Sequence, residues 1–249
     1  MMDGCPPDSA ASPPPFASPT RLPPQEFAAT LQAVIFDMDG LMLDTERWER
    51  EAWRRIAREH GRTLSDEFFE RLVGRRERDT AHLMREHFGE HFPFEAARAE
   101  ARALFECWIV HCPTPMKPGL TGLLDTLQRL GIPLAVASST ARSRALRRLG
   151  ELAQRFQVSV FGDEVLHAKP DPEIYQRTLA QLGLAPSVAL ALEDSPPGFR
   201  AAHAAGLATI VVPDLLPAPE DAVYVCNSLK DIADWLESGR ARTPHPKRL

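Results

Sequence analysis

The stretch AVIFDMDGLMLDTE, from Ala33 to Glu46, decides the fold. Its first four residues form an uninterrupted apolar run, which is typical of a parallel strand that helices cover on both faces. Asp37 and Asp39 follow this run directly, although charged side chains are costly at the edge of a buried strand. Gly40 comes next, and because it has no Cβ atom it lets the chain turn sharply. The pattern predicts a buried strand with two carboxylates at its carboxyl end.

Three later segments repeat this apolar pattern. The segment IPLAVAS ends at Ser138, VALALE ends at Glu193, and LATIVVP ends at Pro213. The first two lead into the helical patterns ARSRALRRLG and PPGFRAAHAAG, and a last strand, AVYVCN, precedes a short helix, SLKDIADWLES. Strands that alternate with helices predict an α/β fold with a doubly wound parallel sheet.

An all-helical block interrupts this alternation after the first strand. Its segments, TERWEREAWRRIAREHG, SDEFFERLVG, RDTAHLMREHFG and EAARAEARALFECWIVH, are amphipathic at helical spacing. We expect Trp48, Trp53 and Trp108 in the core of this block. The predicted domains are an α/β core over 31–47 and 116–238, and an inserted helical cap over 48–115. Residues 1–30, which are rich in proline, are expected to be a disordered leader, and residues 239–249 a frayed tail.

The composition argues against several classes of protein. The 29 Lys and Arg residues and the 34 Asp and Glu residues give a formal net charge of −5. No broad basic surface is therefore expected for nucleic acid or for an anionic membrane. No apolar run approaches the roughly 20 residues that span a bilayer, and the first residues lack the features of a signal peptide. We expect a soluble, cytoplasmic monomer that binds a small molecule, with all four cysteines, Cys5, Cys107, Cys112 and Cys226, as free thiols.

Polar clusters follow the three strands that precede helical segments. These clusters are Asp37 and Asp39, then Ser138-Ser139-Thr140, then Glu193-Asp194-Ser195. In open α/β sheets the ligand site lies outside the carboxyl ends of the strands, so one crevice should collect them. Two carboxylates 4 Å apart repel by on the order of 4 kcal/mol at an effective dielectric constant near 20. A hard divalent cation would relieve this repulsion, and oxygen ligands from Asp37, Asp39 and Asp194 suit Mg²⁺.

A second cation is expected from Lys169, in the segment HAKPDPEIY. Its place before Pro170, in the loop that leads to the LEDS strand, favours a role in the site over an ordinary exposed lysine. Ser138 lies where a strand gives way to a helix, so its hydroxyl and the N–H groups that follow can hold an anion. The alternative for Ser138 is a plain helix-capping role, which Ser139 or Thr140 could fill equally well.

Four motifs, in the order FDMDGLMLDTE, ASST, KPDPEIY and LEDSPPGFRAAHAAG, closely resemble the haloacid dehalogenase-like (HAD) hydrolases from Ala33 to about Trp235. The resemblance is closest to the phosphatase and β-phosphoglucomutase-like branch with a small helical cap, and it implies a Rossmann-like core. It also implies that Asp37 is the nucleophile, which forms an aspartyl-phosphate with Mg²⁺ as the cofactor. Asp39 would be the general acid and base, and its backbone carbonyl would bind the metal.

The same resemblance assigns roles to the other polar residues. Ser138, Ser139 and Lys169 would bind the phosphate or the rest of the substrate, while Asp194 would complete the metal site with Glu193 beside it. A dehalogenase is not favoured, because such enzymes attack carbon and need no proton donor two residues after the nucleophile. The preferred function is therefore hydrolysis of a small organic phosphate, either a sugar phosphate or a nucleotide-like compound.

Two alternatives stay open. In β-phosphoglucomutases the first cap helix usually carries a histidine where this chain has Glu49, and the mutase loop carries an arginine close to Glu77. Arg75, Arg76 and Arg78 lie near enough in the sequence to replace that arginine, so a sugar-phosphate mutase is the first alternative. The second is a non-catalytic protein that binds a phosphorylated metabolite, although such a protein would not need both aspartates of the first motif.

Overall fold

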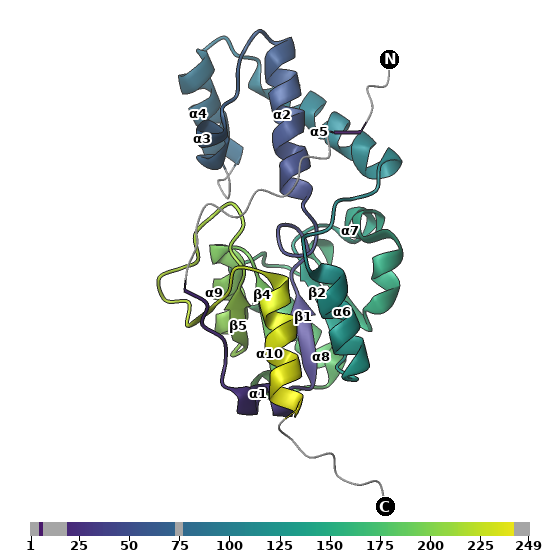
Figure 1. Cartoon of the computed structure of the whole chain (residues 1–249). Coiled ribbons are helices and arrows are strands. Elements are labelled where there is room, and N and C mark those ends of the chain that lie inside the picture. The colour runs from purple at the N-terminus through teal and green to yellow at the C-terminus, as the bar shows by residue number, and fades with distance from the viewer. Residues whose placement is uncertain (1–4, 7–18, 73–76, 242–249) are drawn as a thin grey trace, which may run out of the picture. The chain divides into compact units, whose positions relative to one another are not determined.

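Six parallel strands form one sheet in the residues that the computed structural model describes, which are 5–6, 19–72 and 77–241 (Figure 1). The strands are β1 (Ala33–Phe36), β2 (Leu134–Ser138), β3 (Val158–Phe161), β4 (Ala189–Glu193), β5 (Ala208–Val211) and β6 (Tyr224–Val225). Their order across the sheet is β3-β2-β1-β4-β5-β6, and each neighbouring pair is parallel. The predicted α/β fold with a doubly wound parallel sheet is confirmed.

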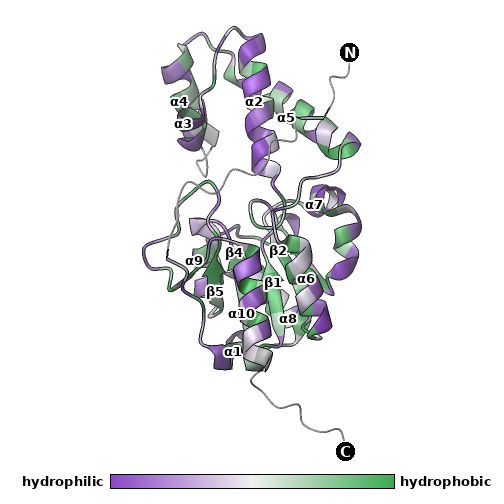
Figure 2. Cartoon of the chain, viewed as in Figure 1, coloured by the Kyte–Doolittle hydropathy of each residue, from purple (hydrophilic) through white to green (hydrophobic). Residues whose placement is uncertain are grey.

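Helices cover both faces of this sheet (Figure 1). One face packs against α1 (Gln25–Thr30), α6 (Leu120–Arg129), α7 (Arg142–Leu149) and α10 (Leu229–Ala241), and the other against α8 (Glu173–Leu182) and α9 (Pro196–Ala204). Short 3₁₀ turns are η1 (Gly150–Arg155), η2 (Gly162–Glu164) and η3 (Pro186–Val188). Figure 2 shows hydrophobic residues along the central strands and hydrophilic residues on the covering helices.

The burial of both faces explains the uninterrupted apolar runs. Along β1, Val34 and Phe36 belong to the core on one side of the sheet and Ile35 to the core on the other. Successive side chains of a strand point to opposite faces, so a strand covered on both sides needs apolar residues at every position. Within the described residues, no helix has the length and apolar composition that would be needed to cross a membrane.

A second compact unit consists of Asp44–Pro115 together with Cys5 and Pro6. Its helices are α2 (Thr45–Glu59), α3 (Asp66–Glu70), α4 (Glu77–Phe88) and α5 (Phe94–His111). Trp48, Trp53 and Trp108 are at most 8% exposed; Trp48 meets Trp108 edge to face, and Trp53 stacks on Phe94. These three tryptophans form part of the core of the helical unit, as the sequence predicts.

The prediction of a disordered leader over residues 1–30 is wrong for its last part. Arg21 forms an antiparallel bridge with Val225 of β6, and Ala28 of α1 is fully buried. The Trp235 indole N–H donates to the Pro23 carbonyl at 2.9 Å. This segment has too few apolar residues for a core of its own, but α10 and β6 supply the surface on which it packs. Residues 1–4 and 7–18 of the predicted leader, and 242–249 of the predicted tail, lie outside the described residues.

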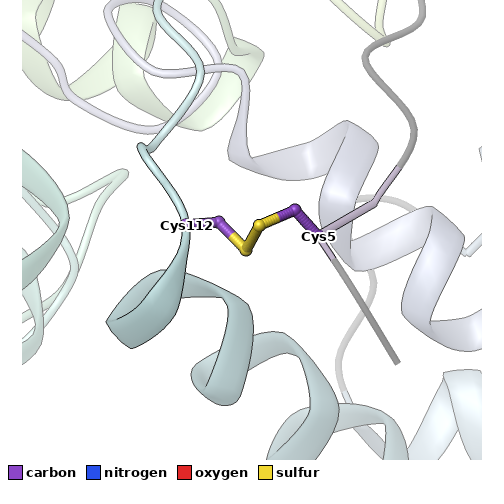
Figure 3. The surroundings of a disulfide bond; sticks show 2 residues. All are labelled: Cys5 and Cys112. Carbon is purple, nitrogen blue, oxygen red and sulfur yellow. A yellow bond between two sulfur atoms is a disulfide. The ribbon is translucent and has the colours of Figure 1, made fainter. Parts of the chain in front are cut away.

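A disulfide joins Cys5 to Cys112, whose Cα atoms are 5.8 Å apart (Figure 3). The prediction of four free thiols is wrong for this pair, because two cysteines 107 residues apart give no local sign that they will meet. Cys107 and Cys226 are free. Burial raises the pKa of the Cys226 thiol to about 12, so this thiol stays protonated at neutral pH.

Candidate active site

The carboxyl ends of β1, β2 and β4 lie side by side at one edge of the sheet. Phe36 pairs with Val136 on one side and with Leu192 on the other, so the residues that follow these positions are neighbours. The Asp37 N–H donates to the Leu192 carbonyl at 3.0 Å, which extends the pairing one residue beyond β1. The register thus brings Asp37, Ser138 and the Glu193-Asp194 pair to the same edge, where ligands bind in open α/β sheets.

Lys169 lies at the centre of this edge. Its Nζ atom is 2.5 Å from Asp37 Oδ1 and 2.6 Å from Glu193 Oε1, and it donates to the Ala137 carbonyl at 2.9 Å. The Lys169 side chain is only 6% exposed, Asp37 is 8% exposed, and Glu193 is fully buried. Charges this deeply buried persist only when they are paired, so Lys169 is not an ordinary exposed lysine.

The surroundings shift the pKa values of both partners. Burial raises the pKa of the Asp37 carboxyl from its usual 3.8 to about 7, against the opposing effect of Lys169 and with a further contribution from Glu193. Burial also disfavours the charged form of Lys169, but Asp37 and Glu193 offset this and hold the pKa of Lys169 well above its ordinary value. Lys169 is therefore a permanent cation at neutral pH, whereas Asp37 exchanges its proton near neutrality when no metal is bound.

Tyr175 belongs to this cluster, although it was not among the predicted site residues. Its hydroxyl donates to Glu193 Oε1 at 2.5 Å, and Lys169 Nζ lies 3.4 Å from the same hydroxyl oxygen. Tyr175 is fully buried, and burial followed by the charge of Glu193 raises its pKa well above the ordinary value. It therefore stays a neutral donor that fixes Glu193 beside Lys169. Its place at the end of KPDPEIY, six residues after Lys169, is the signal that could have found it.

The Asp39 carboxylate contacts a separate pair of donors. The Thr140 hydroxyl donates to Asp39 Oδ2 at 2.8 Å, and Arg148 Nη1 donates to Asp39 Oδ1 at 2.8 Å. The Asp39 side chain is 25% exposed and that of Arg148 is 12% exposed. Thr140 was predicted to lie in the polar cluster after β2 or to cap the helix that follows, whereas Arg148 was not predicted. Nothing in the segment RALRRLG distinguishes this arginine from its neighbours.

The two predicted phosphate-binding serines differ in their positions. Ser138 is the last residue of β2 and is 2% exposed, and its hydroxyl oxygen accepts the Thr140 N–H at 3.1 Å. Ser139 is exposed, and Gly162 packs so closely on its backbone that a Cβ at Gly162 would lie 2.0 Å from the Ser139 carbonyl oxygen. Ser138 therefore lies within the buried edge of the sheet, whereas Ser139 borders it.

Acidic side chains at this edge could hold a metal ion. Oxygen atoms of Asp37, Glu193 and Asp194 lie within 4.8 Å of one another, and all three residues are buried. Glu193 is already engaged, because Oε1 contacts Lys169 and Tyr175 and Oε2 accepts the Asp194 N–H at 3.3 Å. Asp37 and Asp194 are therefore the side chains that best fit a hard divalent cation.

Gly40 makes room for this acidic group. Its φ is +85°, in the left-handed region that favours glycine, as the predicted sharp turn requires. A Cβ at this position would lie 2.2 Å from Asp194 Oδ2. The glycine thus serves both the turn and the close approach of the Asp194 carboxylate.

Comparison with known proteins identifies the family. A family model described as haloacid dehalogenase-like hydrolase matches residues 31–206. The chain belongs to this family. The match confirms the resemblance carried by the four sequence motifs, and it runs from before β1 to just beyond α9, which includes strands β1 to β4.

Several relatives of this HAD-like hydrolase cover most of the chain. The phosphorylated carbohydrates phosphatase of Thermotoga maritima is 33% identical over 227 residues, which are 88% of this chain and 96% of that protein. A structure described as a candidate β-phosphoglucomutase, also from Thermotoga maritima, is 31% identical with a TM-score of 0.71 and covers 84% of this chain and 99% of its own. CbbY from Rhodobacter sphaeroides, in complex with xylulose-(1,5)-bisphosphate, is 26% identical with a TM-score of 0.64, over 81% of this chain and 96% of its own.

Proposed function

We propose that this HAD-like hydrolase is a Mg²⁺-dependent phosphatase that hydrolyses a small phosphomonoester through an aspartyl-phosphate on Asp37. The observation that carries the proposal is the buried contact of Asp37 with Lys169, at 2.5 Å, beside the Glu193-Asp194 pair at the end of β4. A nucleophilic carboxylate next to a permanent cation and a divalent metal site is suited to phosphoryl transfer, which depends on positioning and on charge neutralisation.

The residues of the chain divide the work of this reaction. Asp37 attacks phosphorus, so that the bond to the leaving oxygen breaks as the aspartyl-phosphate forms. Lys169 neutralises negative charge on the transferring group and keeps Asp37 in place, while the Ser138 hydroxyl and the N–H groups after β2 bind phosphoryl oxygens. Asp39 protonates the leaving oxygen and then takes a proton from the water that cleaves the aspartyl-phosphate.

Asp37, Asp194 and the backbone carbonyl of Asp39 would hold Mg²⁺. When bound, the ion would orient the phosphate and neutralise its charge. It would also favour the ionised form of Asp37, whose pKa is about 7 without it. Tyr175 and Lys169 already occupy Glu193 Oε1, so in this proposal Glu193 fixes Lys169 and is not a direct ligand.

Sugar phosphates are the proposed substrate class. Relatives named as a phosphorylated carbohydrates phosphatase and as CbbY with a bound sugar bisphosphate support this choice. A relative from Drosophila melanogaster is named as a probable pseudouridine-5'-phosphatase, and it is 32% identical over 209 residues, so nucleotide-like monophosphates belong in the test.

The second candidate is a sugar-phosphate mutase, because the chain is 31% identical to a candidate β-phosphoglucomutase. Glu49, which replaces the histidine usual in mutases, weighs against it and is exposed on α2. Arg75 and Arg76 lie outside the described residues, as do the side chains of Glu77 and Arg78. An assay of both activities is therefore needed to distinguish a mutase from a phosphatase.

The deciding experiment measures phosphate release from sugar phosphates, nucleoside monophosphates and p-nitrophenyl phosphate, with Mg²⁺ and with EDTA. We expect release of phosphate only with Mg²⁺, and loss of turnover in Asp37→Asn. Lys169→Ala should lose most of its activity while unfolding cooperatively, and unchanged kinetics would remove Lys169 from the mechanism. If no compound releases phosphate but β-glucose 1-phosphate is isomerised, the chain is a mutase.

A further inference from the structure

The Asp39 carboxylate is held by two donors, neither of which comes from its own segment. Thr140 lies in the turn after β2, and Arg148 in the last turn of α7. Each donates to a different carboxylate oxygen at 2.8 Å, and Arg148 Nη1 lies 3.5 Å from Thr140 Oγ1. Three polar groups thus meet at one point, and two bonds to two oxygens define the orientation of the carboxylate.

Both donors are themselves fixed by the fold. The Thr140 N–H donates to the Ser138 hydroxyl oxygen, which holds the turn against the end of β2. On α7, the buried Ala145 and Leu149 anchor the helix in the core on one face of the sheet. The Arg148 side chain leaves this anchored helix and is only 12% exposed. An arginine on a rigid base, with little exposure, pairs with a carboxylate more firmly than a surface arginine does.

We propose that Arg148 is a positioning residue, which together with Thr140 holds Asp39 in the orientation that proton transfer requires. The inference rests on the proposed function, since it gives Arg148 a role only through Asp39. Without the guanidinium, the Asp39 side chain would reach other rotamers, and a smaller fraction of the enzyme would have its proton donor aligned with the leaving oxygen. A misplacement on the order of 1 Å at a catalytic group can lower the rate by about 100-fold.

A purely structural role and a substrate-binding role predict different results. If Arg148 only stabilises α7, its loss should lower the free energy of unfolding and slow all substrates alike. If Arg148 binds the substrate directly, its loss should raise KM and should do so whether or not Asp39 is present. The positioning role predicts a lower kcat, little change in KM, and an effect that disappears when Asp39 has already been removed.

The experiment is a double-mutant cycle on the full chain, with Arg148→Ala, Asp39→Asn and their combination. Each is assayed with a sugar phosphate, which has a poor leaving group, and with p-nitrophenyl phosphate, which has a good one. We expect Arg148→Ala to lower kcat about 10- to 100-fold on the sugar phosphate and much less on p-nitrophenyl phosphate. In the Asp39→Asn background the same change should alter kcat by less than about 2-fold.

Two further variants complete the cycle. Arg147→Ala removes an exposed arginine from the same turn of α7 and is expected to keep the wild-type rate. Arg148→Lys keeps the charge and should recover part of the lost kcat, and it also serves as the test if Arg148→Ala does not fold. Additive effects of Arg148→Ala and Asp39→Asn, equal slowing of both substrates, or a change confined to KM would overturn the inference. A wild-type chain without turnover, or an Asp39→Asn variant at full rate, would overturn the proposed function itself.

Discussion

Replacing Gly40 by alanine should weaken metal binding in addition to destabilising the fold. The added Cβ would lie 2.2 Å from Asp194 Oδ2, and a carbon–oxygen contact needs roughly 3.3 Å. The Asp194 carboxylate must therefore move by about 1 Å from its present position near Asp37. Displacing or loosening a metal ligand through its neighbours typically lowers affinity 10- to 100-fold. The φ of +85° adds about 1 to 2 kcal/mol of backbone strain for any residue with a Cβ.

Gly131 provides a matched control for the backbone strain. Its φ is +66°, and a Cβ there would meet nothing within 4 Å, so Gly131→Ala carries the strain without the contact to Asp194. Through this strain both variants should lose about 1 to 2 kcal/mol of unfolding free energy in urea with EDTA present, and Gly40→Ala should lose more because of its contact with Asp194. Calorimetric titration with Mg²⁺ should then show a dissociation constant about 10- to 100-fold higher for Gly40→Ala alone. Equal Mg²⁺ affinity in the two variants would refute the assignment of Asp194 to the metal site.

Three further predictions concern the buried cluster and the disulfide. Because the folded pKa of Asp37 is about 7 and its ordinary value is 3.8, the folded metal-free protein binds the extra proton between these values. The unfolding free energy of wild type in EDTA should therefore fall as pH rises from about 4 to 7, relative to Asp37→Asn, and parallel curves would contradict this. Tyr175→Phe removes a buried hydrogen bond to the Glu193 carboxylate and should cost about 1.5 to 3 kcal/mol in urea unfolding, whereas a loss below 0.5 kcal/mol would make that bond unimportant. Peptide mapping without reductant should find Cys5 linked to Cys112, and alkylation of both in the native, unreduced protein would show that the disulfide is absent.

The strands were predictable because their signal is local. A strand covered on both faces needs apolar residues throughout, and the segments around β1, β2 and β4 supply them without interruption. β3 gives a weaker signal because it is the outermost strand on its side of the sheet. Only Val160 and Phe161 of its four residues are buried. This strand was not predicted for that reason. Helix α1 was not predicted either, because it is buried by contacts with α10, which lies about 200 residues later in the chain.

The site residues also differ in whether the local sequence predicts them. Asp37, Lys169 and Asp194 follow strands or lie in a recognisable motif, so their meeting at one edge follows from parallel topology. Arg148 pairs with Asp39 across 109 residues, and Tyr175 of α8 pairs with Glu193 at the end of β4. Such pairs depend on which face of a helix meets the sheet and on the rotamers chosen there, and local sequence spacing records neither.

The acids of the site form two groups. Asp39 is paired with Arg148, a cation of the protein itself. In the buried group, Lys169 contacts Asp37 and Glu193, and oxygen atoms of Asp37, Glu193 and Asp194 lie within 4.8 Å of one another. Burial and the neighbouring carboxylates favour the protonated form of Asp37, which raises its pKa to about 7. The proposed divalent cation would relieve the repulsion between these carboxylates without a proton and would leave Asp37 ionised for attack. The same ion would then contribute both to the stability of the cluster and to its reactivity.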